Sequence, residues 1–277
     1  MIWRPTLPDS IDGKPLATKI SHVFREFPYD RLDASTGFWM RPEVVMALLL
    51  GYLFVSKPLF RWIGRTLLPS NPKESIGFRY AIAVHNLGLA VFSAITAWNS
   101  WAVVLEHARD YGAMATYCDT NGSLWRNGLG VWSTIFYISK FYEFVDTWIL
   151  VLKGKKASFL QVYHHTGIAF IMWGAVASQA AWLSFVVLLN SVIHTLMYTY
   201  FFIKTLSPTT EIKAAKYLTM AQIGQFFTGI IGSSGVLYLG EECASQSARF
   251  ALLLLHLYGY GLIGLFFTFA QRKYKKT

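Results

Sequence analysis

The feature that most limits the folds open to this chain is a series of apolar stretches, each long enough to cross a lipid bilayer as a helix. A spanning helix needs about 20 apolar residues. We predict seven such helices, at 43–60, 80–106, 131–152, 159–180, 181–206, 216–239 and 249–270. An interpretation with six helices stays open, because the fourth and fifth stretches adjoin each other and the only break between them falls around residues 177–182.

Composition agrees with a membrane protein. Hydrophobic residues make up 54% of the 277 residues and charged residues 14%, which is too little polar surface for a soluble domain of this size. No apolar segment follows a basic start within the first forty residues, so we expect no cleavable signal peptide. We therefore predict an all-α polytopic membrane protein with a single domain over 1–277 and no internal repeat.

Charges between the stretches predict the orientation. With seven helices, every second loop lies on the same face, and the loops and tail of one face are strongly basic. Their basic residues are Lys57, Arg61, Arg65, Lys73, Arg79, Lys153, Lys155, Lys156, Lys204, Lys213, Lys216, Arg272, Lys273, Lys275 and Lys276. Cytosolic loops carry such an excess, so we expect 1–42 to be luminal, 43–270 to form the transmembrane region and 271–277 to be cytosolic. The net charge of +10 comes largely from these loops and does not indicate a nucleic-acid partner.

Three short features fit this orientation. Asn121 begins a glycosylation sequon in a predicted luminal loop. Cys118 and Cys243 both fall on the luminal side, where disulfides persist, so the sequence allows a bridge between them. Lys273 and Lys275 have the spacing that resembles a retrieval signal of the endoplasmic reticulum, although a plain basic anchor would look the same.

Ionisable side chains in the third stretch point to a polar site inside the membrane. Insertion of such groups is costly, so they usually face the protein interior and serve a function. Lys140, Glu143 and Asp146 are spaced by three, which places them along one stripe of a helix. This ladder could hold helices together or support an active site, and the sequence leaves both interpretations open.

The next three stretches add histidine, tyrosine and amide side chains. These residues are Gln161, His164, His165, Asn190, His194, Tyr198, Thr219, Gln222 and Gln225. Glu143, His164, His194 and Gln225 each lie eight to ten residues from the nearest cytosolic lysine, a depth of roughly 12–15 Å at the rise of an α-helix. Side chains at one depth predict a chamber entered from the cytosol, although amides can also simply join helices.

Neutral imidazole is both a nucleophile and a general base near pH 7. Metal binding is the rival interpretation, because paired histidines also occur in the di-iron desaturases and hydroxylases of membranes. Those sites need more histidines in more boxes, and His22, His85, His107 and His256 are scattered away from the cluster. A three-histidine metal site stays open, but we predict no metal ligand. A transporter or receptor with seven helices is the third alternative, which the missing repeat and the cytosolic position of the cluster disfavour.

Four blocks of these residues resemble the motifs of a known family, the elongation-of-very-long-chain-fatty-acids proteins. They are Lys140-x-x-Glu143-x-x-Asp146-Thr147, the histidine box ending in His164-His165, Asn190-x-x-x-His194-x-x-Met197-Tyr198 and Thr219-x-x-Gln222-x-x-Gln225. The blocks follow the family order over about half of the chain. Gln161 stands where the family box usually has a histidine, which resembles elongases that act on polyunsaturated chains.

The resemblance implies an acyltransferase, a very-long-chain 3-oxoacyl-CoA synthase that condenses an acyl-CoA with malonyl-CoA and needs no redox cofactor. It implies an acyl-imidazole on His164, with His165 as the alternative. His194 would act at the thioester and the malonyl group, and Asn190 and Gln161 would donate hydrogen bonds to oxyanions. Glu143 and Asp146 would orient the imidazoles or balance the charge of Lys140.

The substrates imply further sites and partners. CoA phosphates require basic side chains at the chamber mouth, and the candidates are Lys153, Lys155, Lys156, Lys204 and Arg272. The acyl chain would run towards the lumen, where the closed end sets its length. Besides the lipid bilayer, we expect the ketoreductase, dehydratase and enoyl reductase of the elongation cycle as partners, and a homo-oligomer is compatible with the sequence. No nucleic acid is expected.

Overall fold

The computed structural model describes residues 34–67, 75–209 and 215–274, and no strand occurs within these ranges. Outside them lie the residues for which we made predictions at Lys73, Lys213, Lys275 and Lys276 and within the first 33 positions. In chain order the helices are α3 (Ala34–Met40), α4 (Pro42–Leu50), the π-helix η2 (Gly51–Ser56), α5 (Lys57–Thr66), α6 (Ile76–Tyr111), α7 (Ala113–Cys118), the π-helix η4 (Trp125–Leu129), α8 (Gly130–Tyr142), α9 (Phe144–Leu152), α10 (Phe159–Ala177), α11 (Leu183–Leu206), α12 (Ala215–Leu239), the 3-10 helix η5 (Gly240–Glu242) and α13 (Gln246–Tyr274).

Within the described ranges, five helical segments are long and apolar enough to cross a membrane. They are Pro42–Thr66, Ile76–Tyr111, Leu183–Leu206, Ala215–Glu242 and Gln246–Tyr274. This finding supports an all-helical membrane protein. Helices also occupy the third and fourth predicted stretches, but α8 and α9 are short, and the first half of α10 contains Gln161, His164 and His165. The count of seven spanning helices therefore stays a prediction.

The predicted continuous helix over 131–152 is wrong in one respect, because it is interrupted at Glu143. α8 ends at Tyr142 and α9 begins at Phe144. The backbone N–H of Asp146 bonds to the carbonyl of Glu143 at 3.1 Å, a tighter turn than that of an α-helix. Neither proline nor glycine occurs at this point, and the break coincides with a buried ion pair of the Glu143 side chain.

The first long helical segment runs from α4 through η2 to α5. Pro58 lies two residues after the end of η2 and has no N–H to donate to the carbonyl four residues earlier. The wider turns of the π-helix just before it accommodate the missing bond. The end of α3, just before this segment, is fixed to the bundle, because Trp173 Nε1 donates to the Met40 carbonyl at 2.8 Å and the Tyr137 hydroxyl donates to the Trp39 carbonyl at 2.7 Å.

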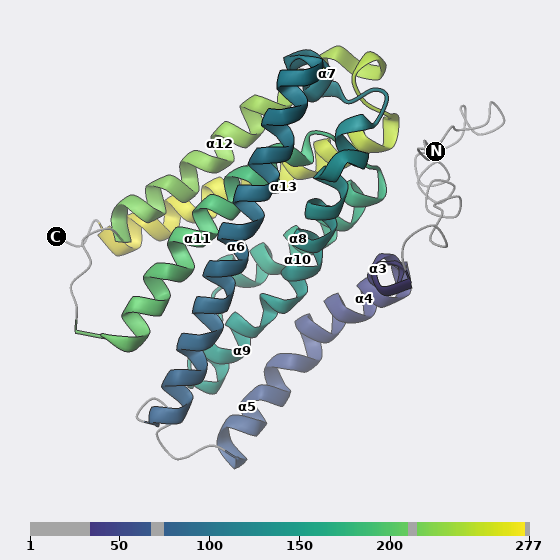
Figure 1. Cartoon of the computed structure of the whole chain (residues 1–277). Helices are drawn as coiled ribbons and strands as arrows, with labels where there is room; N and C mark the ends of the chain where they lie inside the picture. The colour runs from purple at the N-terminus through teal and green to yellow at the C-terminus, as the bar shows by residue number, and fades with distance from the viewer. Residues whose placement is uncertain (1–33, 68–74, 210–214, 275–277) are drawn as a thin grey trace.

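α6 and α11 lie side by side along most of their length (Figure 1). The buried face of α6 consists mainly of small or polar side chains, namely Ala83, His85, Asn86, Ala90, Ser93, Thr96, Ala97 and Ser100. Small side chains let helices approach closely within a membrane. Its exposed face carries large apolar side chains, including Val84, Val91, Ile95 and Trp98. A helix of this kind suits a lipid-facing position.

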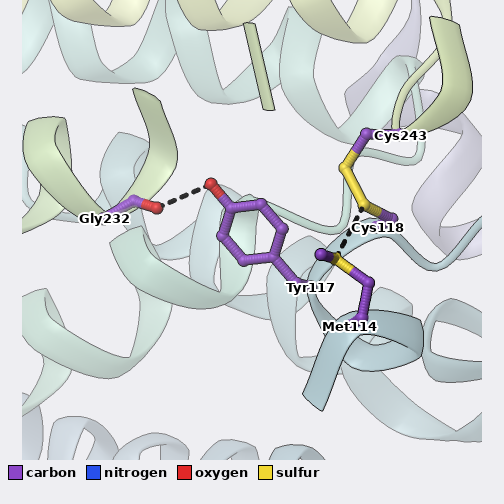
Figure 2. Close-up of a disulfide and its surroundings, with 5 residues drawn as sticks. All are labelled: Met114, Tyr117, Cys118, Gly232 and Cys243. Carbon is purple, nitrogen blue, oxygen red and sulfur yellow. Dashed lines mark hydrogen bonds between the residues drawn. A yellow bond between two sulfur atoms is a disulfide. The ribbon is translucent and has the colours of Figure 1, made fainter. Parts of the chain in front are cut away.

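A disulfide joins Cys118 at the end of α7 to Cys243 after η5. Figure 2 shows that the neighbouring Tyr117 reaches α12, where its hydroxyl donates to the carbonyl of Gly232 at 2.8 Å. The edge of the Tyr117 ring contacts Phe185 of α11. The disulfide end of the bundle therefore connects α7, α11 and α12. Asn121 lies exposed in the adjacent loop, and its glycosylation stays a prediction.

Candidate functional site

A cleft of about 670 Å³ lies among α6 and α9 to α13. Its lining brings together most of the predicted polar residues, which are Glu143, Asp146, Gln161, His164, His165, Asn190, His194, Tyr198, Thr219, Gln222 and Gln225. Residues from four separate stretches of sequence thus meet in one space. Lys140 is not part of the lining and lies behind it, almost fully buried.

The buried Lys140 lies at the floor of the site. Its Nζ donates to Glu143 Oε1 at 2.6 Å and to Asn190 Oδ1 at 3.4 Å. The ring centroid of Phe136 lies 3.8 Å from the same ammonium. An ammonium can only donate, so the amide oxygen of Asn190 faces Lys140 and its NH₂ group is left for the cleft. Asn190 is therefore available as a hydrogen-bond donor in the cleft.

Glu143 connects Lys140 to the histidines. Its Oε1 lies 3.5 Å from His194 Nδ1, an approach that orients the imidazole. With Nδ1 towards the carboxylate, Nε2 is the nitrogen of His194 that can serve the cleft. Among the described residues, no hydrogen-bond partner meets Glu143 Oε2.

Asp146 has partners on other helices and does not complete the predicted ladder with Lys140. Its Oδ1 lies 2.8 Å from His85 Nε2 on α6, and its Oδ2 accepts from the Tyr198 hydroxyl on α11 at 2.7 Å. His85 Nδ1 lies 3.2 Å from the Tyr142 hydroxyl. The prediction that His85 is remote from the cluster was therefore wrong. It is the only histidine within 80–106, and the rule that singled out Lys140 could have found it.

The two histidines of the box have different surroundings. His164 Nδ1 lies 2.9 Å from the Tyr258 hydroxyl on α13. His165 packs edge-on against the rings of Tyr52 and Phe144, and its Nδ1 has no hydrogen-bond partner among the described residues. Tyr258 was not predicted as a site residue, because it is one aromatic residue in a long apolar helix.

Ser158 and Thr147 position Gln161, the first residue of the histidine box. Ser158 caps α10 by accepting from the Gln161 N–H at 3.2 Å, as expected for a serine at a helix N-terminus. Gln161 Nε2 donates to Thr147 Oγ1 at 3.1 Å, and the Tyr52 hydroxyl lies 2.8 Å from the same oxygen. The amide is thus held against α9 at the edge of the cleft.

The amides on α12 are held less firmly. Gln222 Nε2 contacts Met197 Sδ at 3.4 Å. The buried Oε1 of Gln225 has no hydrogen-bond partner in the described part of the chain. Gln225 lines the cleft, so this oxygen is an acceptor that a ligand could satisfy.

A smaller apolar cavity of about 70 Å³ continues from the cleft. The two share His164, Asn190, Gln225 and Phe226. The cavity extends among α10, α11, α12 and α13 towards Trp182, Phe185, Gly229 and Ser233. His164 therefore lies where a polar space meets an apolar one. His256 bonds to Ser233 at 2.9 Å, away from the lining of the cleft.

Basic side chains surround the other end of the cleft, and we call this set the basic mouth. It consists of Arg79, Lys153, Lys155, Lys204 and Lys273. Three of these residues were predicted to bind CoA phosphates, whereas Arg79 and Lys273 were not. The predicted Lys156 and Arg272 do not line the cleft. Within 34–67, 75–209 and 215–274, no group of three or more His, Cys, Asp or Glu residues is placed to hold a metal ion.

Comparison with known proteins identifies the family. The family model described as ELO, the GNS1/SUR4 family, matches residues 38–277. This chain belongs to the ELO family. Its ELO relatives include a protein of Dictyostelium discoideum provisionally named as a fatty acid elongase, which is 32% identical over 241 residues, covering 86% of this chain and 76% of the relative.

Two further relatives are also named as elongases. Long chain fatty acid elongase 2 of Caenorhabditis elegans is 25% identical over 262 residues, or 94% of this chain and 92% of the relative. Fatty acid elongase 1 of Trypanosoma brucei brucei is 29% identical over 231 residues, or 76% and 73%. The family and these names support fatty acid elongase function.

Proposed function

We propose that this ELO member condenses a long-chain acyl-CoA with malonyl-CoA to a 3-oxoacyl-CoA two carbons longer, releasing CO₂ and CoA. The observation that carries the proposal is a cleft with three successive environments. It has a basic mouth, a middle with histidines and amides, and an apolar extension. An acyl-CoA has the same three parts in the same order: an anionic nucleotide, a thioester and an alkyl chain.

The first step we propose is acyl transfer to His164. A ring nitrogen attacks the thioester carbon, the C–N bond forms, and the C–S bond breaks as the CoA thiolate leaves. His164 is favoured over His165 because it lines both the cleft and the apolar cavity, whereas His165 lines the cleft and packs against aromatic rings. A thioester whose chain fills the apolar cavity would have its carbonyl carbon beside His164.

The second step we propose is carbon–carbon bond formation. Malonyl-CoA loses CO₂, and the resulting enolate carbon attacks the acyl carbon while the bond to the imidazole breaks. Negative charge develops on the carbonyl oxygens in both steps, and preorganised donors stabilise it. The NH₂ group of Asn190 is turned to the cleft, and Gln161 is an amide donor at its edge. His194, oriented by Glu143, would act at the thioester and the malonyl group.

Both substrates carry CoA, whose phosphates would bind at the basic mouth. Phosphates form strong charge-assisted hydrogen bonds with lysine and arginine. Three of the predicted lysines line this mouth, and we assign phosphate binding to Arg79 and Lys273 as well. We propose a polyunsaturated acyl substrate, because Gln161 in the box resembles the elongases of such chains. The reaction as written needs no cofactor.

The proposed cellular setting follows from topology. We propose seven spanning helices in the endoplasmic reticulum membrane, with a luminal N-terminus and a cytosolic C-terminus. The basic mouth would then open to the cytosol, where acyl-CoA and malonyl-CoA are available, and the disulfide end would lie in the lumen. A ketoreductase, a dehydratase and an enoyl reductase would be partners that complete the elongation cycle.

The test is condensation by the purified protein in lipid nanodiscs. Malonyl-CoA is supplied with saturated, monounsaturated and polyunsaturated acyl-CoAs, and the 3-oxoacyl-CoA is detected by mass spectrometry. We expect product from the native protein and none from His164→Gln. His107→Gln is the matched control, because His107 bonds Thr116 and Ser123 far along α6 from the cleft. A folded native protein that makes no product with any acyl chain would refute the proposed function.

A quench experiment with acyl-CoA alone tests the intermediate. Peptide mass spectrometry should find the acyl mass on the peptide that contains His164. An acyl group on His165 would correct the residue, and product formation without any acylated histidine would overturn the two-step mechanism while leaving the condensation intact.

A further inference from the structure

The hydrogen bonds of Tyr258 determine which nitrogen of His164 carries a proton. The Tyr258 hydroxyl lies 2.9 Å from the backbone carbonyl of His164 and 2.9 Å from His164 Nδ1. A carbonyl oxygen can only accept, and a phenol has one hydrogen to give. That hydrogen goes to the carbonyl, so Nδ1 must be the donor to the phenol oxygen. The neutral imidazole then has its hydrogen on Nδ1 and its lone pair on Nε2.

The ring of Tyr258 is held in place from two sides. It stacks on the ring of Tyr163, with centroids 5.2 Å apart and planes at 25°. It also lies directly over Gly167, where a Cβ atom would overlap the ring. The Tyr163 hydroxyl lies over Gly261 in the same way and donates to the Tyr258 carbonyl at 3.4 Å. Two glycines on facing helices thus make room for one stacked pair, and the hydroxyl of Tyr258 has little freedom to move.

Tyr258 faces the apolar cavity and does not line the cleft. His164 lines both spaces, and its Nδ1 side is occupied by the phenol. Nε2, at the far side of the ring, is therefore left for the cleft, where the thioester and the malonyl group would meet. A nucleophilic imidazole needs its lone pair on the reacting nitrogen. In other enzymes, loss of the group that fixes the tautomer of a catalytic histidine lowers the reaction rate strongly.

We propose that Tyr258 is a positioning residue that holds His164 in the Nδ1–H tautomer and so makes Nε2 the nucleophile. This inference rests on the proposed function for its consequence in catalysis. The tautomer itself can be measured without any activity. In this assignment Tyr258 borders the apolar cavity that would hold the acyl chain, and its hydroxyl acts on the chemistry only through His164.

The first measurement is the ¹⁵N spectrum of histidine-labelled native protein, with His164→Gln identifying the His164 signals. We expect an N–H type signal for Nδ1 and a pyridine type signal for Nε2. In Tyr258→Phe, which keeps the stacked ring and loses the hydroxyl, we expect a mixture of tautomers. Native protein with the hydrogen on Nε2 of His164 would overturn the proposal whether or not the protein is an elongase.

The second measurement compares acylation kinetics of Tyr258→Phe with those of Tyr163→Phe. The control removes a hydroxyl from the other ring of the same stack, and that hydroxyl donates to the Tyr258 backbone carbonyl. We expect the acylation rate of Tyr258→Phe to fall about 10- to 100-fold, by analogy with the cost of losing a group that orients a metal-binding histidine. The KM for acyl-CoA should stay near that of the native protein.

The outcomes separate the two proposals. An active native protein with equal rates in Tyr258→Phe and Tyr163→Phe would overturn the role of Tyr258. An equal fall in both variants, with the native tautomer retained in each, would also overturn it, because the effect would then come from packing. An inactive native protein counts against the proposed function, and the spectrum still decides the tautomer.

Discussion

The buried pair of Lys140 and Glu143 allows a quantitative test of how this membrane protein tolerates charge. Both side chains are nearly inaccessible, with 1% and 3% of their surfaces exposed, and the charged atoms lie 2.6 Å apart. At an effective dielectric constant near 20, two unit charges at this distance attract by about 6 kcal/mol. Desolvation of the two ions costs several kcal/mol each and offsets most of this attraction.

The perturbation is a double-mutant cycle with Lys140→Met and Glu143→Gln. Either single variant leaves one buried charge without its partner, so we expect a loss of about 3–5 kcal/mol in the free energy of unfolding. The double variant removes both charges and should lose less than either single variant. The remaining contacts of Lys140 with Asn190 and Phe136 can soften the effect of Glu143→Gln.

The assay is unfolding in mixed micelles with increasing sodium dodecyl sulfate, followed by tryptophan fluorescence. The matched control is the pair Arg249 and Glu241, whose atoms lie 2.9 Å apart but whose Glu241 side chain is 85% exposed. Removing either charge there should cost at most about 1 kcal/mol. Single variants of Lys140 or Glu143 as stable as the native protein, or a double variant that loses the sum of the two, would refute the reasoning.

Two further predictions concern the disulfide end and the apolar cavity. Replacing Cys118 and Cys243 by serine should lower the free energy of unfolding by up to about 5 kcal/mol, the chain-entropy limit for a loop of 125 residues, and thiol alkylation before and after reduction checks that the bond is present. Gly229→Leu should shift the products of the condensation assay to shorter chains, because Gly229 lines the apolar cavity. Gly224→Leu on the exposed face of the same helix should leave the product lengths unchanged, and an unchanged profile in Gly229→Leu would contradict the position of the acyl chain.

Local features of the sequence were enough to predict the helices and most of the polar side chains that line the cleft. Apolar stretches of about 20 residues depend on composition over a short window, and helix ends depend on nearby signals such as the caps Ser75 and Ser158. Polar residues at spacings of three and four share a face of their own helix. Equal distances from the basic loops then predicted that His164 and His194 meet at one depth, and both line the cleft.

The partners of these residues could not be predicted in the same way. Spacing within one helix does not determine how far that helix is rotated or shifted against its neighbours. The contact of His85 with Asp146 depends on the packing of α6 beside α9 and α11, and that of Tyr258 with His164 depends on the stacking of α13 on α10. Helix packing also determines which basic side chains reach the basic mouth, and Arg79 lines it whereas Lys156 does not.

The sequence by itself thus determined an all-helical membrane protein, its family motifs and the polar residues that must be buried, because insertion of each helix depends on its own residues. The tertiary structure decided the interruption of the helix at Glu143 and the hydroxyl that faces His164 Nδ1. It also decided that Glu143 pairs with Lys140 whereas Asp146 pairs with His85. These features depend on distances between atoms on different helices. Side-chain packing across helix interfaces sets such distances, and no pattern along one helix contains them.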